Sequence, residues 1–89
     1  MRGLKVSYSN LAELMKQGRE AKNIRLQDAA MLIGVTNGQY LWACENGHAN
    51  FPAGKIKRAI ELYGLKKADV ITAICEDFRA GAIEFLRDK

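Results

Sequence analysis

The chain has 89 residues, of which 48% are hydrophobic and 27% charged, and its 14 Lys and Arg against 10 Asp and Glu give a formal net charge of +4. This length fits one small domain, and the composition excludes an intrinsically disordered chain. The positive balance is modest, so it is compatible with a polyanionic partner but does not by itself require one.

The cysteines and the hydrophobic runs narrow the class of protein further. Cys44 and Cys75 lack the close pairing of a CxxC motif, which excludes a disulfide framework and a zinc site built on such a motif. We expect both to be core thiols in a reducing compartment. No run of residues is long and apolar enough for a secretory signal or a membrane span, so the sequence predicts a cytoplasmic protein without membrane contact.

The first predicted helix follows a short basic segment, residues 1–8, which contains Arg2 and Lys5. Either Ser9 or Asn10 can cap this helix, which extends to about residue 22. Apolar or small residues recur on one of its sides at intervals of three and four, namely Leu11, Leu14, Met15, Gly18 and Ala21. This spacing predicts an amphipathic helix that packs on the rest of the domain.

Residues 26–47 carry the most informative local pattern, because they predict two short helices joined at a glycine. The first covers residues 26–33 and ends at Gly34, and the second covers about residues 38–46, with Thr36 or Asn37 as its cap. Two helices joined in this way form a helix-turn-helix, in which the second helix enters the major groove of DNA. The pattern therefore points to a DNA-binding regulator.

Two further helices complete the predicted fold. Pro52 suits the first turn of a helix that stops at Gly64, and the last helix extends from about Lys66 to Arg87. Apolar residues of the last helix alternate at spacings of four and three, and we call them the α-helical seam: Ile71, Cys75, Phe78, Ala82 and Phe85. The sequence thus predicts an all-α, compact five-helix domain with an extended C-terminal helix.

From Leu11 to about Ile71 the order of features resembles the lambda-repressor-like (XRE/Cro-type) family of helix-turn-helix DNA-binding domains. The matching positions are Arg19, Ile24, Ala30, Gly34-Val35-Thr36, Tyr40-Leu41, Glu45-Asn46-Gly47 and Leu62-Tyr63-Gly64-Leu65. The resemblance implies a DNA-binding domain over residues 9–72. Residues 66–89 then form a C-terminal helix that can act as a dimerisation element.

The resemblance also implies an ion pair between Arg19 and Glu45, which is costly to break when buried. Glu45 lies eleven residues after Gly34, one more than the commonest spacing in the family. An extra residue therefore has to be accommodated between the two positions, either in the turn or in the helix that follows it.

The two ways of accommodating it place different side chains in the core. If the turn is longer, Leu41 and Cys44 point inward, whereas a longer helix turns Tyr40 and Ala43 inward. We prefer the longer turn, because it keeps the glutamate facing its arginine and lets Asn37 cap the helix.

With that register, the resemblance assigns DNA contacts to particular side chains. The base-reading candidates are Asn37, Gln39, Tyr40 and Ala43. Only Gln39 is well suited to two-point pairing with adenine, so phosphate contacts and DNA shape should supply much of the affinity. The phosphate-binding candidates are Arg25, His48, Asn50 and Lys55. An ordinary solvated arginine fits the position of Arg25 equally well.

Two apolar features have alternative interpretations. Trp42 occupies a position that is usually polar in the family; it can pack against Phe51 and the start of the fourth helix, which we prefer, or form an interaction surface. The α-helical seam can fold back on the first helix or pair with the seam of a second copy. The helix beyond Cys75 carries more apolar surface than a free helix end should show, namely Phe78, Ile83, Phe85 and Leu86. This favours a homodimer with two recognition helices about 34 Å apart.

These observations predict a sequence-specific DNA-binding transcriptional regulator, a repressor that inserts the helix near residues 38–46 into the major groove as a dimer. The alternative is a protein-interaction module on the same scaffold, either an antitoxin that binds a toxin or an adaptor that binds another protein through Tyr40 and Trp42. The sequence offers no metal cluster, phosphate loop or nucleophile with a base, so we expect neither enzymatic activity nor a cofactor. The remaining acidic residues that we considered fit exposed or helix-capping carboxylates: Asp28, Asp69, Glu76 and Asp77.

Overall fold

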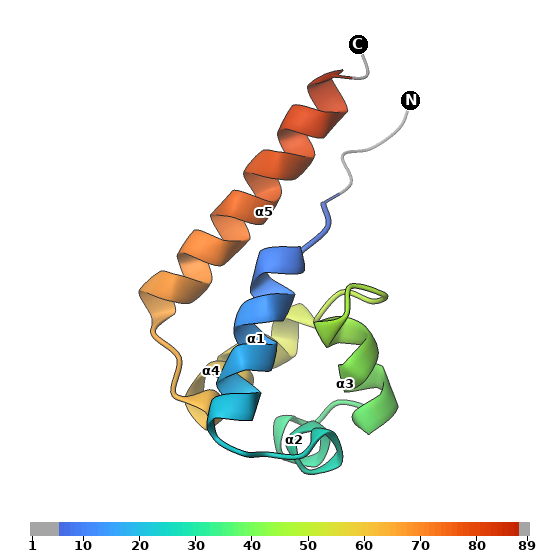
Figure 1. Ribbon diagram of the computed structural model, residues 1–89, viewed down its shortest axis with the longest axis vertical. Coiled ribbons are helices and arrows are strands. Elements are labelled where there is room, and N and C mark those ends of the chain that lie inside the picture. The colour runs from blue at the N-terminus through green and yellow to red at the C-terminus, as the bar shows by residue number, and fades with distance from the viewer. Residues whose placement is uncertain (1–5, 88–89) are drawn as a thin grey trace.

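The computed structural model describes residues 6–87, and within that range every regular element is helical (Figure 1). The five α-helices are α1 (Ser9–Ala21), α2 (Leu26–Ile33), α3 (Gly38–Glu45), α4 (Ile56–Tyr63) and α5 (Lys67–Arg87), and a 3-10 turn, η1, covers Ala53–Lys55. The predicted all-α fold of five helices is confirmed. The basic residues Arg2 and Lys5 of the expected N-terminal segment lie outside the described residues.

The helix α1 occupies the centre of the fold and contacts α3, α4 and α5. Figure 1 shows α2 and α3 packed around one end of α1, while α5 runs beside it and continues past its first residue. This projection of α5 gives the molecule an elongated outline of 44 × 25 × 19 Å. One end of the molecule is therefore a compact helical cluster and the other is a single long helix.

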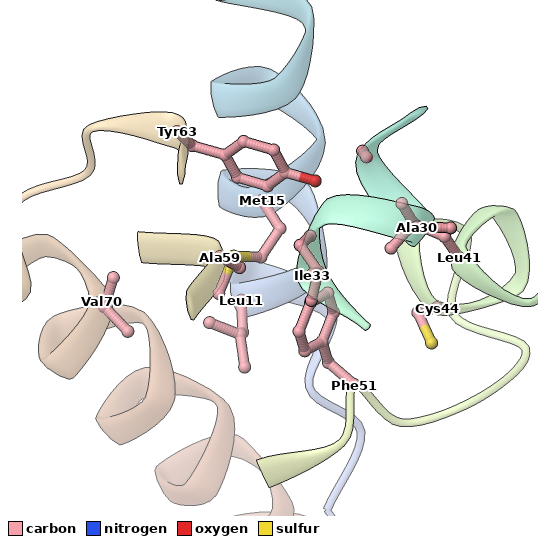
Figure 2. Close-up of a cluster of buried hydrophobic side chains, with 11 residues drawn as sticks. Leu11, Met15, Ala30, Ile33, Leu41, Cys44, Phe51, Ala59, Tyr63 and Val70 are labelled. Atoms are coloured by element: carbon pink, nitrogen blue, oxygen red, sulfur yellow. The ribbon is translucent and has the colours of Figure 1, made fainter. Parts of the chain in front are cut away.

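One buried cluster joins all five helices (Figure 2). Its members are Leu11 and Met15 of α1, Ala29, Ala30 and Ile33 of α2, Leu41 and Cys44 of α3, Phe51 of the following loop, Ala59 and Tyr63 of α4, and Val70 of α5. The small side chains of Ala29 and Ala30 allow the helices around α2 to approach closely, and burial of the larger ones supplies the main favourable free energy of folding.

The ends of α1 and α2 follow the sequence closely. Asn23 adopts a left-handed conformation with φ of 56° just after α1, a conformation that Asn tolerates better than most residues. Gly34 has φ of 91° and its N–H bonds to the carbonyl of Ala30, which closes α2. The chain can therefore turn sharply between α2 and α3.

The start of α1 differs from the prediction. Neither Ser9 nor Asn10 caps the helix, because the residue at the cap is Tyr8 and its side chain makes no capping hydrogen bond. The carboxylate of Asp77 on α5 takes over this role by accepting hydrogen bonds from the backbone N–H groups of Asn10 and Leu11, at 2.9 and 3.0 Å. Asp77 is thus a capping carboxylate, but one supplied by another helix and almost completely buried.

Two other expectations are wrong. Cys44 is buried as expected, but Cys75 is exposed, because α5 faces α1 with the stripe that contains Val70, Ala73 and Asp77. Pro52 does not lie in the first turn of α4; it precedes η1, and α4 begins only at Ile56. Neither difference changes the fold, but the first leaves a thiol on the surface of α5.

Candidate nucleic-acid interface

The helix α3 is fixed against α2 by a close approach at its first residue. A Cβ atom at Gly38 would lie 3.1 Å from the Cα and N atoms of Gln27, so a larger residue there would push the two helices apart. The preceding Asn37 accepts a hydrogen bond from the N–H of Tyr40 at 2.8 Å and caps α3 as predicted. The glycine and the asparagine together set the direction in which α3 leaves the turn.

The register of α3 follows the preferred alternative. Leu41 and Cys44 are buried, whereas Gln39 and Trp42 are exposed. The extra residue between the two helices is therefore taken up by the turn, not by α3. Burial in this setting raises the pKa of the Cys44 thiol above its ordinary value, which keeps the thiol protonated and unreactive.

The end of α3 is tied to α1 by the ion pair that the resemblance implies. Arg19 Nε lies 2.8 Å from Glu45 Oε2 and Arg19 Nη2 lies 3.1 Å from Oε1, while Arg19 Nη1 donates to the carbonyl of Ile24 at 2.8 Å. The hydrogen bond with Glu45 raises the pKa of Arg19. This two-point pairing, with Glu45 almost fully buried, fixes both the distance and the orientation of α3 relative to α1.

The base-reading candidates lie on the outward side of α3 and at its start. Gln39 is exposed and Ala43, one helical turn later, is partly buried beside it. Tyr40 is partly buried on the flank of α3 and its hydroxyl donates to the carbonyl of Asn50 at 3.4 Å. Asn37 uses its side-chain oxygen in the cap, which leaves its amide nitrogen as the group that can meet a ligand.

Trp42 does not follow the preferred interpretation. We expected it to pack against Phe51, but the indole is 47% exposed and stacks on the imidazole of His48, with ring centroids 5.5 Å apart and an interplanar angle of 18°. Phe51 is instead part of the buried cluster. The stack holds the exposed His48 against the flank of α3, so the loop after α3 and the helix itself form one continuous surface.

The phosphate-binding candidates lie at the start of α2, in the loop after α3 and near the turn between the two helices. Arg25 stands at the cap of α2 with its side chain 86% exposed, and its Nε lies 3.2 Å from the Asp28 carboxylate. His48 and Asn50 are exposed in the loop after α3. Lys55 approaches the turn between α2 and α3, since its Nζ lies 3.3 Å from the position of a Cβ at Gly34.

One residue of this corner was missed by the sequence analysis. Arg58 Nη1 lies 3.4 Å from the same Cβ position at Gly34, so two cations converge on the turn that precedes α3. Lys55 and Arg58 are three residues apart, and α4 begins with Ile56, so they share one side of the helix start. This spacing was the available signal, but only the packing of α4 against α2 shows what the pair faces.

The distribution of charge distinguishes this corner from α5. Residues 25–58 contain four Lys and Arg against Asp28 and Glu45, and Glu45 is neutralised by Arg19. The helix α5 contains three basic residues against four acidic ones. The net positive charge of residues 25–58 therefore favours a polyanion there, whereas the slightly negative charge of α5 does not.

Other kinds of site find little support in the part of the chain that the structure describes. Residues 6–87 contain no group of three or more His, Cys, Asp or Glu side chains placed to hold a metal ion. None of the described helices combines the length and the apolar character needed to cross a bilayer.

Comparison with known proteins supports the fold. No protein-family model and no curated protein sequence matches the chain. Among solved structures, the chain is similar to the crystal structure of the clp gene regulator ClgR from Corynebacterium glutamicum, with a TM-score of 0.66 and 18% sequence identity over 92% of this chain and 86% of that chain. At this level of identity the likeness shows a shared helical fold over nearly the whole length of both chains.

Proposed function

We propose that this protein is a DNA-binding transcriptional regulator that inserts α3 into the major groove. The observation that carries the proposal is the exposed side of α3, with the exposed Arg25 at the cap of α2 and Lys55 and Arg58 at the turn before α3. A helix presented in this way fits the major groove, and the cations beside it meet the phosphates. The fold shared with a structure described as a gene regulator agrees with this function.

Base recognition rests on few side chains. The amide of Gln39 is a donor and an acceptor on the outward side of α3, which suits the N6 and N7 atoms of adenine. The Asn37 amide nitrogen and the flank of Tyr40 lie next to it, and Ala43 can add only an apolar contact. We therefore expect one or two strongly specified base pairs in each half-site, with DNA shape contributing at the others.

More groups are available for phosphate binding than for base recognition. The first N–H groups of α2 have no capping side chain, because Arg25 at the cap makes no such bond, and free amides at a helix start attract anions. His48 and Asn50 are exposed in the loop after α3, and Lys55 lies at the turn before it. These groups would bind phosphates of the duplex near the two ends of α3.

We further propose that the protein acts as a repressor in the form of a homodimer joined through α5. On the seam, Ile71 is 60% and Phe78 51% exposed, and Cys75 is also exposed. A second copy is the best occupant, because α5 projects beyond the helical cluster and its near-neutral charge avoids the repulsion that two basic α2–α3 corners would cause. One helix pair buries less than about 1,200 Å², so the dimer should be weak and strengthened by a palindromic operator.

Selection of duplexes from a random library, followed by affinity measurements over a range of salt, tests DNA binding. Affinity should fall linearly with salt on logarithmic axes. Gln39→Ala should lower discrimination at one base pair by roughly 5- to 150-fold, the value of one two-point contact. The matched control is Gln17→Ala, which removes an exposed glutamine on α1 that bonds to Glu13. Absence of any enriched sequence, or unchanged discrimination in Gln39→Ala, contradicts the base-reading assignment.

A second candidate function is protein binding, as in an antitoxin. The observation that favours it is the exposed Trp42 on α3, together with Met31 and Leu32, which are exposed on the outer side of α2. Exposed apolar side chains on two adjacent helices are typical of protein-binding surfaces. A stoichiometric complex with the product of a neighbouring gene, lost in Trp42→Ala and accompanied by no salt-dependent DNA binding, would support this function over the first.

A further inference from the structure

We infer that Asp77 is a positioning residue: it locks α5 to the DNA-binding helices and thereby sets the spacing of the two half-sites that a dimer reads. This inference rests on the proposed function, since it needs α3 to bind DNA and α5 to bind its copy. It assigns a role to a carboxylate that is buried inside the protomer, away from the surfaces proposed to bind DNA and the second copy.

The carboxylate of Asp77 joins α5 to the first turn of α1. Asp77 is 1% exposed, and each of its two carboxylate oxygens accepts a hydrogen bond from a backbone N–H of α1, those of Asn10 and Leu11. These amides belong to the first turn of α1, where no partner within the helix exists. The bonds join residues 66 and 67 positions apart in sequence, so they connect two helices at opposite ends of the chain.

The two hydrogen bonds of Asp77 restrict the orientation of α5 relative to α1. The apolar contacts of Val70 with the core are non-directional and tolerate rotation or sliding of α5. Two hydrogen bonds to fixed backbone donors tolerate neither, because hydrogen bonds weaken steeply with distance and angle. Asp77 therefore fixes the rotation of α5 about its own axis, and with it the direction in which the neighbouring Phe78 points.

The helix α1 connects α5 to α3. The helix α1 is a rod of 13 residues, about 20 Å long. Asp77 holds its first turn, and Arg19, in its last turn, holds Glu45 of α3. In a dimer joined through α5, the position of each α3 would therefore depend on two charge-assisted contacts, one at each end of α1.

The Asp77 contact should limit the half-site spacings that a dimer can bind. Moving one base pair along DNA displaces a half-site by 3.4 Å and rotates it about the helix axis by about one tenth of a turn. A dimer with α5 locked to α1 can match one spacing only, whereas a dimer with α5 free to rotate can match several. Loss of the Asp77 contact should thus broaden the preferred spacing without weakening the binding of a single half-site.

Duplexes that carry two copies of the selected half-site, separated by spacers that increase by one base pair, test this inference. The parent protein should prefer one spacing by roughly 10-fold over its neighbours, the size of one mismatch. In Asp77→Ala the preference should fall below about threefold while single half-site affinity stays within about twofold. Asp77→Asn, which keeps an acceptor oxygen, should be intermediate, and the control Glu76→Ala, at an exposed neighbour, should match the parent.

The outcomes separate the two proposals. A parent that binds no duplex in a salt-dependent way, or shows no spacing preference, overturns the proposed DNA-bound dimer and this inference with it. A parent with a sharp optimum that persists in both folded Asp77 variants overturns the inference alone. Equal losses for single and paired half-sites also overturn it, because they indicate a merely structural role. If Asp77→Ala does not fold, as judged by circular dichroism, the Asp77→Asn variant decides.

Discussion

The two ends of α1 are both held by buried carboxylates, but by different chemistry. At the last turn, the carboxylate of Glu45 pairs with the guanidinium of Arg19, so two side chains must both be present. At the first turn, the carboxylate of Asp77 bonds to backbone amides, so only one side chain is needed. A contact between two side chains requires two particular residue types, so it can be recognised in the sequence from both. A contact between a side chain and the backbone requires only one particular residue type and is harder to recognise.

The two contacts also differ in the free energy of unfolding that is lost when each is broken. Removing Glu45 leaves the Arg19 cation largely buried without its partner, and an uncompensated charge is expensive. Removing Asp77 leaves neutral amides without an acceptor, which costs less.

The largest expected effect is that of Glu45→Gln. It should reduce the free energy of unfolding by about 3 to 5 kcal/mol, the usual cost of stranding one member of a buried ion pair. Urea denaturation followed by circular dichroism measures it. The matched control is Glu20→Gln, because Glu20 lies 4.0 Å from the same guanidinium but is 56% exposed. The control should lose less than about 1 kcal/mol, and equal losses in the two variants would show that burial does not decide the strength of the pair.

The next effect is that of Asp77→Ala on stability. Loss of the cap should cost about 2 to 3 kcal/mol, since one buried and one partly buried amide lose a charged acceptor. The adjacent Glu76→Ala removes an exposed carboxylate and should change the urea midpoint little. If Asp77→Ala were no worse than Glu76→Ala, the contact between α5 and α1 would carry no stability of its own.

A smaller effect is expected at high pH from Tyr63, which lies near the Arg19–Glu45 pair. Its hydroxyl has no hydrogen-bond partner among residues 6–87, and burial, with a further contribution from the Glu45 charge, raises its pKa from 10 to about 12. The folded protein therefore keeps the phenol protonated where the unfolded chain ionises it. Stability from this residue is complete below pH 10 and is lost between pH 10 and about 12.

The loss should reach about 2 kcal/mol at the upper end of this range, because each unit of pKa difference is worth about 1.4 kcal/mol. Tyr63→Phe should reduce the alkaline loss by that amount and should not destabilise the protein at neutral pH, since the hydroxyl that it removes is buried and unpartnered. Unfolding curves at pH 8, 10 and 11.5 measure both effects. The same alkaline loss in parent and variant would rule out Tyr63 as its source.

Much of the fold could be predicted from local signals. Gly34 and Asn37 defined the turn and the start of α3, and both act as expected. The required pairing of Arg19 with Glu45 also selected the register that buries Leu41 and Cys44. These predictions succeeded because each depends on residue types within one helix end or within one known pair.

The remaining features depend on which elements meet in space. Asp77 stands beside the exposed Glu76 and looks no different in sequence, and only the packing of α5 on α1 buries it. The seam pattern identified the apolar residues of α5 but not which side faces α1, so Cys75 was placed wrongly. Trp42 was placed wrongly for a similar reason, because its stacking partner His48 belongs to a loop whose path has no periodic signal.

The most direct test of the proposed interface is an NMR titration of the ¹⁵N-labelled protein with its selected duplex. The amides of Gln39 and Ala43, the amides near Arg25, and the indole N–H of Trp42, the one tryptophan in the chain, should shift most, while those of Glu61 and Leu62 in the last turn of α4 should stay in place. Shifts that spare α3 and appear only on α5 or in the acidic groove between α1 and α5, which is lined by Glu13, Asp69 and Glu76, would contradict DNA binding through α3.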